Sequence, residues 1–437
     1  MATIEPFTGV IYNQRVEPDL GMVLAPPYDV ISSNMQDELY ERSPHNVVRL
    51  ILGRQFSDDG DANNRYTRAA GVLRNWMGDG TLTRTEAPAI YLYAQRYTVE
   101  GIARERVGFM CRIKLSPLGK DVHPHERTLA GPKLDRLMLT RACRMNFSPV
   151  FGLYADEGRA LDGMFGHYMA SAVPDVDVTD GEGVEHRMWI ITDPAVTGEA
   201  KRFMADKPVV IADGHHRYET ALNYRNERRA AEGDPAGDQP YDFGLMYLSN
   251  IHGQGFTVLP THRMAGELAS APTAETLANK LAADFDITPL RANHARVDEL
   301  MAGLRGAGAK GPSFAVYTGG GKALLITLKP GITAPAAGAA AELLGRLDVI
   351  VLQELVFEKA LGVTKADVEA KRRVSYTIDP REAMGRVDEG AVNFAFLMNP
   401  TGADQVMRVA LGGGVMPQKS TYFYPKLISG LVMNPLY

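Results

Sequence analysis

The stretch Val209-Val210-Ile211-Ala212-Asp213-Gly214-His215-His216-Arg217 decides the fold, because an apolar run typical of a buried strand stops abruptly at a polar turn. Residues 218–233 then follow the pattern of a helix that a Gly-containing loop closes. Upstream, Trp189–Ile191 predicts another strand, and Asp193 is placed to cap a helix that runs to about Met204. This order predicts a β-α-β-α unit and therefore an α/β fold.

The polar turn has the chemistry of an anion-binding site. A helix N-terminus offers backbone N–H groups and a partial positive charge to phosphate or carboxylate. Gly214 lets a ligand approach the backbone closely. Asp213, His215, His216 and Arg217 add a metal ligand or base, two imidazoles and a guanidinium. We therefore predict that this turn is the chemical centre and that it binds a polyanion.

The length of 437 residues exceeds what one hydrophobic core usually spans, so we expect two domains. We divide the chain into an N-terminal α/β domain, 1–260, which carries the turn, and a C-terminal α/β domain, 261–437. The second domain begins with a segment rich in Ala and Gly, 265–341. Its tail, 412–437, is a candidate to return to the site.

Charge and cysteine content exclude several classes of function. The formal net charge of −5 gives no basic field for duplex DNA or for an anionic membrane. Cys111 and Cys143 are too few for a disulfide framework or a cysteine-based zinc site. We see neither a signal-peptide pattern nor an apolar stretch of membrane-spanning length. We expect a soluble cytoplasmic protein with neither nucleic acid nor membrane as its partner.

Periodicity and turn residues predict the other elements. We expect a serine-capped helix within 31–40 and a helix over 65–77, and strands over 47–52, 89–97, 106–115, 243–248, 255–259, 313–317 and 322–327. Gly319, Gly320 and Gly321 predict that the last two strands form a hairpin.

Four further segments concentrate polar chemistry between apolar stretches. In Ala25–Ile31, two prolines fix a loop that we interpret as a structural turn, although it could also hold Tyr28 and Asp29 in a site. The segment Val122–Arg136 matches no known zinc signature. Its acid–base or metal-binding candidates are His123, His125 and Glu126, and its phosphate-binding candidates are Arg127, Lys133 and Arg136. The alternative is a solvated loop.

The remaining two segments lie later in the chain. In Leu259–Arg263, a strand end precedes His262 and Arg263; strand ends in α/β folds often bind ligands, and a structural role is the alternative. In Met416–Lys426, ammonium and hydroxyl groups could contact phosphate oxygens, but no P-loop glycine pattern precedes them, and the aromatic residues could simply anchor the tail. These groups belong to Lys419, Ser420, Thr421 and Lys426.

The histidines cluster in the chain. Half of the ten fall in three of these segments, namely His123, His125, His215, His216 and His262. We hypothesise that the segments converge in one site.

The chain resembles the bacterial and archaeal family called domain of unknown function 1015. The matching segments span most of the sequence and are Ala25–Ile31, Ser43–Leu50, His125–Thr128 with Gly131–Lys133, Ala212–Tyr218, Leu259–Arg263 and Met416–Phe423. Within that family, Asp213–Arg217 resembles the signature turn of the wider ParB/sulfiredoxin-like group, in which a Gly-containing turn opens a helix over nucleotide phosphates. Members similar in this turn include free-serine kinases. The resemblance implies a ParB/sulfiredoxin-like core with a mixed sheet; this chain is far longer than those kinases.

By this resemblance the protein would transfer a phosphoryl group from ATP, ADP or pyrophosphate to a small hydroxylated metabolite, with Mg²⁺ as cofactor and L-serine as the candidate acceptor. Asp213 would hold Mg²⁺, and Arg217, Lys133 and Lys419 would neutralise the phosphates. Either Glu126 or His216 would be the base. The other candidate donor-binding residues are Gly214, His215, His125, His262, Arg263, Ser420 and Thr421.

Two alternatives stay open at this point. The same histidines and carboxylates could activate water in a metal-dependent phosphatase or other hydrolase. The protein could also be a nucleotide-binding regulator without catalytic activity.

Overall fold

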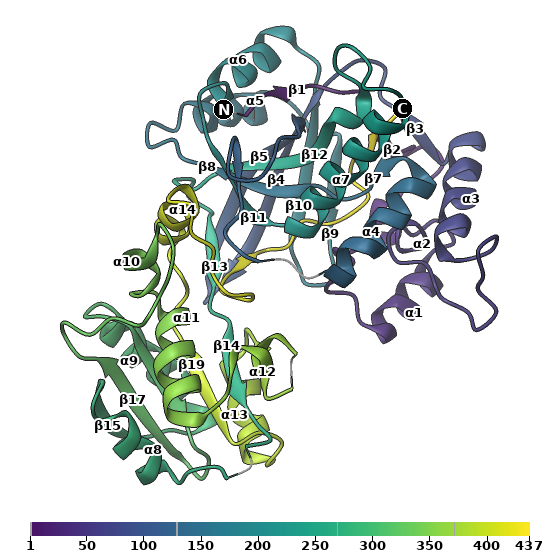
Figure 1. The fold of residues 1–437 in the computed structure, drawn as a ribbon. Helices are drawn as coiled ribbons and strands as arrows, with labels where there is room; N and C mark the ends of the chain where they lie inside the picture. Colours follow the sequence, from purple (N-terminus) through teal and green to yellow (C-terminus); the bar gives the residue numbers. More distant parts are fainter. Residues whose placement is uncertain (1, 128–129, 269, 371) are drawn as a thin grey trace. The chain divides into compact units, whose positions relative to one another are not determined.

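The computed structural model describes residues 2–127, 130–268, 270–370 and 372–437 (Figure 1). Thr128 and Leu129, which belong to the segment around His125, lie outside the described residues. The chain divides into two compact units. Unit 1 consists of Met1–Pro124, Thr128–Thr257 and Pro425–Tyr437, and unit 2 consists of His125–Arg127 and Val258–Tyr424.

The two observed units differ from the two domains expected to meet at residue 260, because two short segments belong to the other unit. The segment Pro425–Tyr437 belongs to unit 1, because its backbone is hydrogen-bonded there. Val10 N–H donates to Met433 O at 2.9 Å, and Ser429 N–H donates to Ala25 O at 2.8 Å. Residues 125–127 belong to unit 2, although the chain on both sides of them lies in unit 1.

Unit 1 is built on a nine-stranded sheet (Figure 1). The order is β6-β11-β8-β12-β5-β4-β10-β9, and β1 pairs with β5. The strands are β1 (Ile4–Glu5), β4 (Ile90–Val99), β5 (Ile102–Lys114), β6 (Val122–His123), β8 (Val150–Tyr154), β9 (Val176–Thr179), β10 (Glu185–Ile191), β11 (Val209–Asp213) and β12 (Phe243–Asn250). The pairs β11–β6 and β12–β8 are parallel and the others antiparallel, so the predicted mixed α/β architecture is confirmed.

The predicted strand–helix order around the turn is observed as β10, α6, β11 and α7. Its two strands are not neighbours, however, because β11 is second from one edge of the sheet and β10 is second from the other. The helices and smaller strands of unit 1 are η1 (Leu20–Met22), α1 (Ser33–Arg42), α2 (Val48–Ile51), α3 (Arg65–Gly78), α4 (Ala130–Cys143), α5 (Ala160–Ser171), α6 (Pro194–Met204), α7 (His215–Ala231), η2 (Pro240–Asp242), β2 (Val10–Tyr12), β3 (Leu82–Arg84), β7 (Met145–Asn146) and β21 (Asn434–Pro435).

The core of unit 1 lies between the sheet and helices α5, α6 and α7. Phe165 of α5, Met204 of α6 and Tyr218 of α7 are buried against Phe109 and Ile211 of the sheet. The Tyr218 hydroxyl donates to Ser116 O at 2.9 Å and accepts from Ser116 N–H at 3.1 Å, which fixes the rotation of α7. Helix α4 lies beside α7 (Figure 1).

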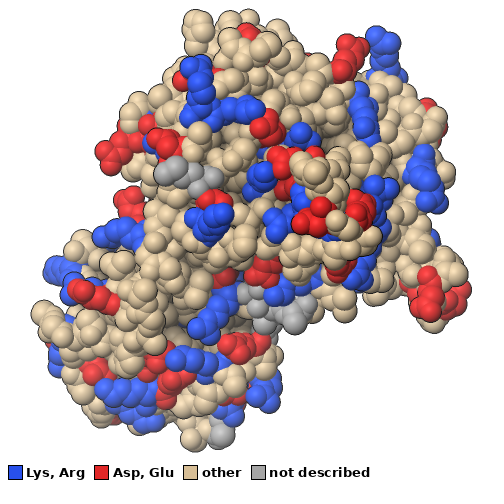
Figure 2. All heavy atoms as spheres, turned by 45° about the horizontal axis from the view of Figure 1, so that its top comes forward, with Lys and Arg blue, Asp and Glu red and all other residues tan. Residues whose placement is uncertain are grey.

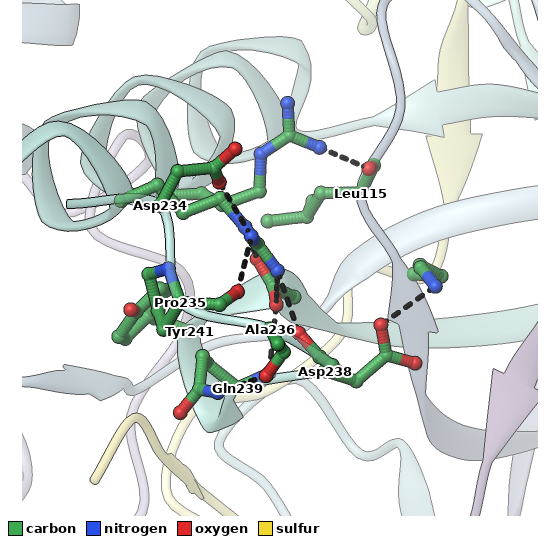
Figure 3. A network of polar contacts seen from close by, with 12 residues as sticks. Leu115, Asp234, Pro235, Ala236, Asp238, Gln239 and Tyr241 are labelled. Carbon is green, nitrogen blue, oxygen red and sulfur yellow. Dashed lines mark hydrogen bonds and ion pairs between the residues drawn. The ribbon is translucent and has the colours of Figure 1, made fainter. Parts of the chain in front are cut away.

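The C-terminal end of α7 is held by a network of polar contacts (Figure 3). Arg229 forms ion pairs with Asp242 and Asp234 and also donates to Pro235 O at 3.1 Å. Nearby, Lys114 of β5 pairs with Asp238 at 2.7 Å. The loop after α7 is therefore held against the helix, and α7 is anchored at both ends.

The predicted strand over 47–52 is wrong, because Val48–Ile51 forms the short helix α2. A short apolar run is compatible with either state. Here the buried Asn46 side chain accepts from Val48 N–H at 3.0 Å and donates to Met22 O at 2.8 Å, so it begins a helical turn. The predicted serine cap of α1 is Ser32, whose hydroxyl accepts from Met35 N–H at 3.3 Å.

Unit 2 contains a six-stranded antiparallel sheet in the order β15-β17-β16-β19-β14-β18. The predicted hairpin is confirmed as β16 and β17, joined by three glycines with positive φ. The elements are β13 (Thr257–Leu259), β14 (His262–Ala265), α8 (Ala274–Leu281), β15 (Phe285–Arg291), η3 (His294–Arg296), α9 (Val297–Gly308), β16 (Ser313–Tyr317), β17 (Lys322–Leu328), α10 (Ala341–Leu344), α11 (Asp348–Val351), the π-helix η4 (Leu352–Leu361), α12 (Lys365–Glu369), β18 (Val374–Thr377), α13 (Pro380–Asp388), β19 (Phe394–Met398), α14 (Ala403–Leu411) and β20 (Tyr422–Tyr424).

Candidate functional site

The turn between β11 and α7 has a backbone that requires glycine. Gly214 is the N-cap of α7 and has φ of 89°, in the left-handed region. A Cβ at this position would lie 2.7 Å from Nε of Arg217. Any larger residue would therefore be strained and would also displace the guanidinium.

Asp213, the last residue of β11, is held by two cations. Its Oδ2 accepts from Arg217 Nη2 at 2.6 Å, and its Oδ1 accepts from Lys426 Nζ at 3.0 Å. Burial alone would raise the pKa of Asp213, but Lys426 and Arg217 hold that pKa well below its usual range. The carboxylate is therefore ionised near neutral pH and lies between two cations.

Lys426 is positioned by buried residues of the sheet. Arg106, which is 1% exposed, donates from Nη2 to Pro425 O at 2.5 Å. Gln95 Nε2 donates to Lys426 O at 2.9 Å. The backbone on both sides of Cα of Lys426 is thus tied to β4 and β5, and the ammonium is directed to the end of β11.

The first turn of α7 carries cationic and neutral groups but no acid. It contains His215, His216 and Arg217, and no side chain caps it. Burial lowers the pKa of His216, and the charges of Lys133 and Arg217 act in the same direction, while Glu219 and Asp29 oppose them. The imidazole is therefore neutral at pH 7 and able to accept a proton.

Lys133 of α4 faces this helix but is paired. Its Nζ lies 2.7 Å from Oε2 of Glu219, one turn beyond His215. The turn, Lys426 and Lys133 all belong to unit 1, so the structure brings these predicted residues together there: Lys133, Asp213, Gly214, His215, His216, Arg217 and Lys426.

A cavity of about 50 Å³, counted as space open to the centre of a water molecule, lies in unit 1 next to Arg217. Its wall is mostly apolar, and its charged groups are Arg217 and Arg136. The Arg136 guanidinium stacks over the Tyr28 ring, 4.0 Å from the ring centroid. Tyr28 was interpreted from the sequence as part of a structural turn, yet it lines this cavity.

Other predicted site residues form a second cluster in unit 2. The His125 imidazole, which is fully buried, is 2.9 Å from the Thr421 hydroxyl. Glu126 Oε1 accepts from Ser420 N–H at 3.0 Å. The Ser420 hydroxyl donates to Pro417 O at 2.6 Å. In this arrangement these groups hold the loop before β20 in place.

His262 and Arg263 of β14 are both buried in unit 2. His262 Nδ1 accepts from Met398 N–H at 3.1 Å, and burial lowers the pKa of His262 to about 4. Arg263 Nη1 donates to Val349 O at 3.2 Å. Lys419 is exposed and has φ of 59°, unusual for a residue other than glycine.

The predicted convergence of the histidine segments in one site stays a prediction. Asp213, His215 and His216 lie in unit 1, and so does His123, whereas His125 and His262 lie in unit 2. The assignment of donor-binding roles to His125, His262, Arg263, Lys419, Ser420 and Thr421 likewise stays a prediction.

The donor groups at Asp213 do not form a ready metal site. Both carboxylate oxygens already accept from cations. Within the described part of the chain, no group of three or more His, Cys, Asp or Glu side chains could hold a metal ion. The role of Asp213 in holding Mg²⁺ stays a prediction.

Charge and hydropathy of the described surface agree with the composition. On the face drawn in Figure 2, lysine and arginine are interspersed with aspartate and glutamate. No helix among the described residues is long and apolar enough to cross a membrane.

The family model for the protein of unknown function DUF1015 matches residues 4–350, so the chain belongs to this family. No curated protein matches the chain. Solved structures similar to it include a conserved hypothetical protein from Pyrococcus furiosus, with 12% identity over 74% of this chain and 94% of that one and a TM-score of 0.33. A free serine kinase in complex with AMP has 12% identity, coverage of 72% and 86%, and a TM-score of 0.33. SbnI from Staphylococcus aureus with a C-terminal truncation has 12% identity, coverage of 74% and 87%, and a TM-score of 0.35.

Sequence reasoning did not single out Lys426 as the partner of Asp213, nor Arg106 and Gln95 as its supports. The sequence offered one signal, the Pro425–Lys426 pair after an aromatic run, but nothing that linked it to a residue 213 positions earlier. Tyr28 and Arg136 stand in two separate segments of the sequence, and only the fold brings the ring and the guanidinium together.

Proposed function

We propose that this protein is a phosphotransferase whose donor phosphates bind at the N-terminus of α7, in unit 1. The observation that carries the proposal is the convergence of Arg217 and Lys426 on Asp213 at an uncapped helix start. Backbone N–H groups, a guanidinium and an ammonium are the groups that stabilise charge on a transferring phosphoryl group. Asp213 keeps both cations in place before the donor arrives.

Within the same unit, His216 is the better candidate for the base that accepts the acceptor's hydroxyl proton. Its pKa is lowered by burial, so the imidazole is neutral at pH 7. The other candidate, Glu126, belongs to unit 2 and accepts a hydrogen bond from Ser420 N–H. A small metabolite with a hydroxyl group is the proposed acceptor, and L-serine is the first to test.

Phosphorus NMR tests the proposal directly. Purified protein is incubated with Mg²⁺ and with ATP, ADP or pyrophosphate in turn, each with and without L-serine. A new phosphomonoester signal that requires serine, and that is lost in Lys426→Met but kept in Lys114→Met, supports the phosphotransferase. Lys114 is the matched control, because it forms an exposed lysine–aspartate pair in the same unit.

Two outcomes contradict the proposal. Inorganic phosphate that appears equally without serine indicates a hydrolase. Nucleotide binding without any turnover, whichever hydroxylated acceptor is supplied, indicates a regulator.

A further inference from the structure

The cavity beside Arg217 has a polar end and an apolar body. The polar end is formed by Tyr28, Arg136 and Arg217, and the apolar wall includes Leu139 and Phe147. Burial and the nearby Asp29 raise the pKa of Tyr28, while the charges of Arg136 and Arg217 act in the opposite direction. Both guanidinium groups therefore act on the same phenol, from two different helices.

The charge at the polar end is positive. Arg136 shares Asp135 with Arg65, and Arg217 shares Asp213 with Lys426. Each of these two carboxylates thus stands between two cations, and Asp29 is a third carboxylate near Tyr28. A ligand that brings its own negative group would meet the guanidinium groups of Arg136 and Arg217 at this end.

The two arginines that line the cavity also have more hydrogen-bond donors than their contacts within the described residues use. Arg136 donates to Asp135 through Nε and Nη2 and to Ile51 O through Nη1 at 2.6 Å. Arg217 donates to Pro149 O and to Asp213. A guanidinium carries five N–H groups, so within the described residues neither side chain has used all of its donors.

The size of the cavity limits the ligand. A volume of about 50 Å³ on this measure holds roughly three to five water molecules. A nucleotide is far too large, and a phosphate ion would leave the apolar wall without a partner. A short carboxylic acid matches both the cationic end and the apolar body.

We propose that this cavity binds the acceptor as a small carboxylate, with the carboxylate group on Arg136 and Arg217 and the carbon skeleton against the apolar wall, so that the hydroxyl group stays on the side that Arg217 shares with the first turn of α7. The inference rests on the proposed function in one respect, namely that the ligand is the acceptor. Arg217 would then contact both substrates, because it lies at the first turn of α7 and also lines the cavity.

The test is a binding experiment without any phosphate donor. Calorimetric titrations use L-serine, glycolate, inorganic phosphate and serinol, which keeps the amine and hydroxyl groups but has no carboxylate. We expect L-serine and glycolate to bind and serinol not to bind. Arg136→Gln should weaken the binding of both acids at least tenfold. Arg141→Gln is the matched control on the same helix, since Arg141 forms an exposed pair with Glu227, and it should leave binding unchanged.

A second variant separates loss of binding from loss of folding. Ala221 is a small residue in the cavity wall, so Ala221→Leu should fill the cavity and abolish binding without removing a charge. Equal binding of serinol and L-serine, tighter binding of phosphate than of glycolate, or unchanged binding in both variants would overturn the inference. Acid binding without any phosphoryl transfer would sustain it while the proposed function fails. Phosphoryl transfer by Arg136→Gln with an unchanged KM for serine would overturn the inference, while the proposed function would stand.

Discussion

Asp213 links the two cations of the proposed phosphate site. Its two oxygens bind Arg217 from the following helix and Lys426 from a distant segment. Strand, turn and helix were predictable at this position, because β-branched residues and a glycine mark them locally. The Lys426 partner was not predictable, since a lysine near aromatic residues fits many surface positions and the pairing depends on the packing of the whole sheet.

Replacing Lys426 by Met should weaken donor binding at least tenfold, because one of the two cations is lost. It should also lower the free energy of unfolding by about 1.5–3 kcal/mol, the range for a hydrogen bond to a charged group. Nucleotide protection in a melting assay and urea denaturation measure the two effects. Lys114→Met is the control, and equal nucleotide protection in both variants would contradict the prediction.

His262 should make unit 2 sensitive to acid. Its pKa is about 4 in the folded chain, and an unfolded histidine has a pKa of about 6.5. Between these values the unfolded state binds more protons, so stability should fall as the pH is lowered through this window, by up to about 3 kcal/mol. Hydrogen exchange at Met398, whose N–H donates to His262, measures the loss.

The control for this pH dependence is His262→Gln, which cannot take up the proton. The protection factor of Met398 in that variant should change much less between pH 6.5 and pH 4.5 than in the wild-type protein. Parallel decreases in the two proteins would show that another group is responsible.

At the scale of elements, α7 is the part of unit 1 that connects both proposed binding sites. Its first turn faces the donor, and Arg217, Tyr218, Thr220 and Ala221 line the cavity. The helix was predictable from its periodicity and its start from Gly214. The short helix α2 was not, because its four residues, three of them apolar, are too few to show a period, and the buried Asn46 side chain begins the helical turn.

Gly214→Ala should be harmful at this element. The residue has a positive φ, and the added Cβ would meet the Arg217 guanidinium at 2.7 Å. We expect a loss of at least about 1 kcal/mol in the free energy of unfolding, together with weakened donor binding. Gly163→Ala, inside helix α5 with open space around its Cβ, should instead be neutral or stabilising by up to about 1 kcal/mol. Similar effects of both changes on donor binding would contradict the proposed role of the turn.

At the scale of the whole molecule, the chain crosses repeatedly between its two units. Residues 125–127 belong to unit 2 and residues 425–437 to unit 1. A division into two domains was predictable from length and composition. The sequence did suggest that the tail, 412–437, returns toward the first domain, and residues 425–437 do belong to unit 1. The excursion of residues 125–127 was not predictable, because His125, Glu126 and Arg127 carry no local pattern that assigns them to either unit.

Removal of residues 425–437 should therefore unfold unit 1 rather than unit 2. The segment contains six large apolar side chains that are buried, namely Leu427, Ile428, Leu431, Val432, Met433 and Leu436. Each contributes about 1.5–3 kcal/mol, so together they contribute about as much as the whole stability of a typical domain or more. Hydrogen exchange should show loss of protection in β11 and β12 and retained protection in β16 and β19. Removal of Tyr437 alone, which is 48% exposed, is the control.

The position of Lys426 also has a consequence for the synthesis of the protein. A ribosome makes Asp213 and Arg217 about two hundred residues before Lys426, and all of unit 2 from Val258 onward is translated in between. Since domains generally fold in the order in which they emerge, a nascent chain holds the strand and the turn but lacks the second cation. The proposed donor site would therefore be completed late in translation, and a chain that stalls within unit 2 would lack Lys426.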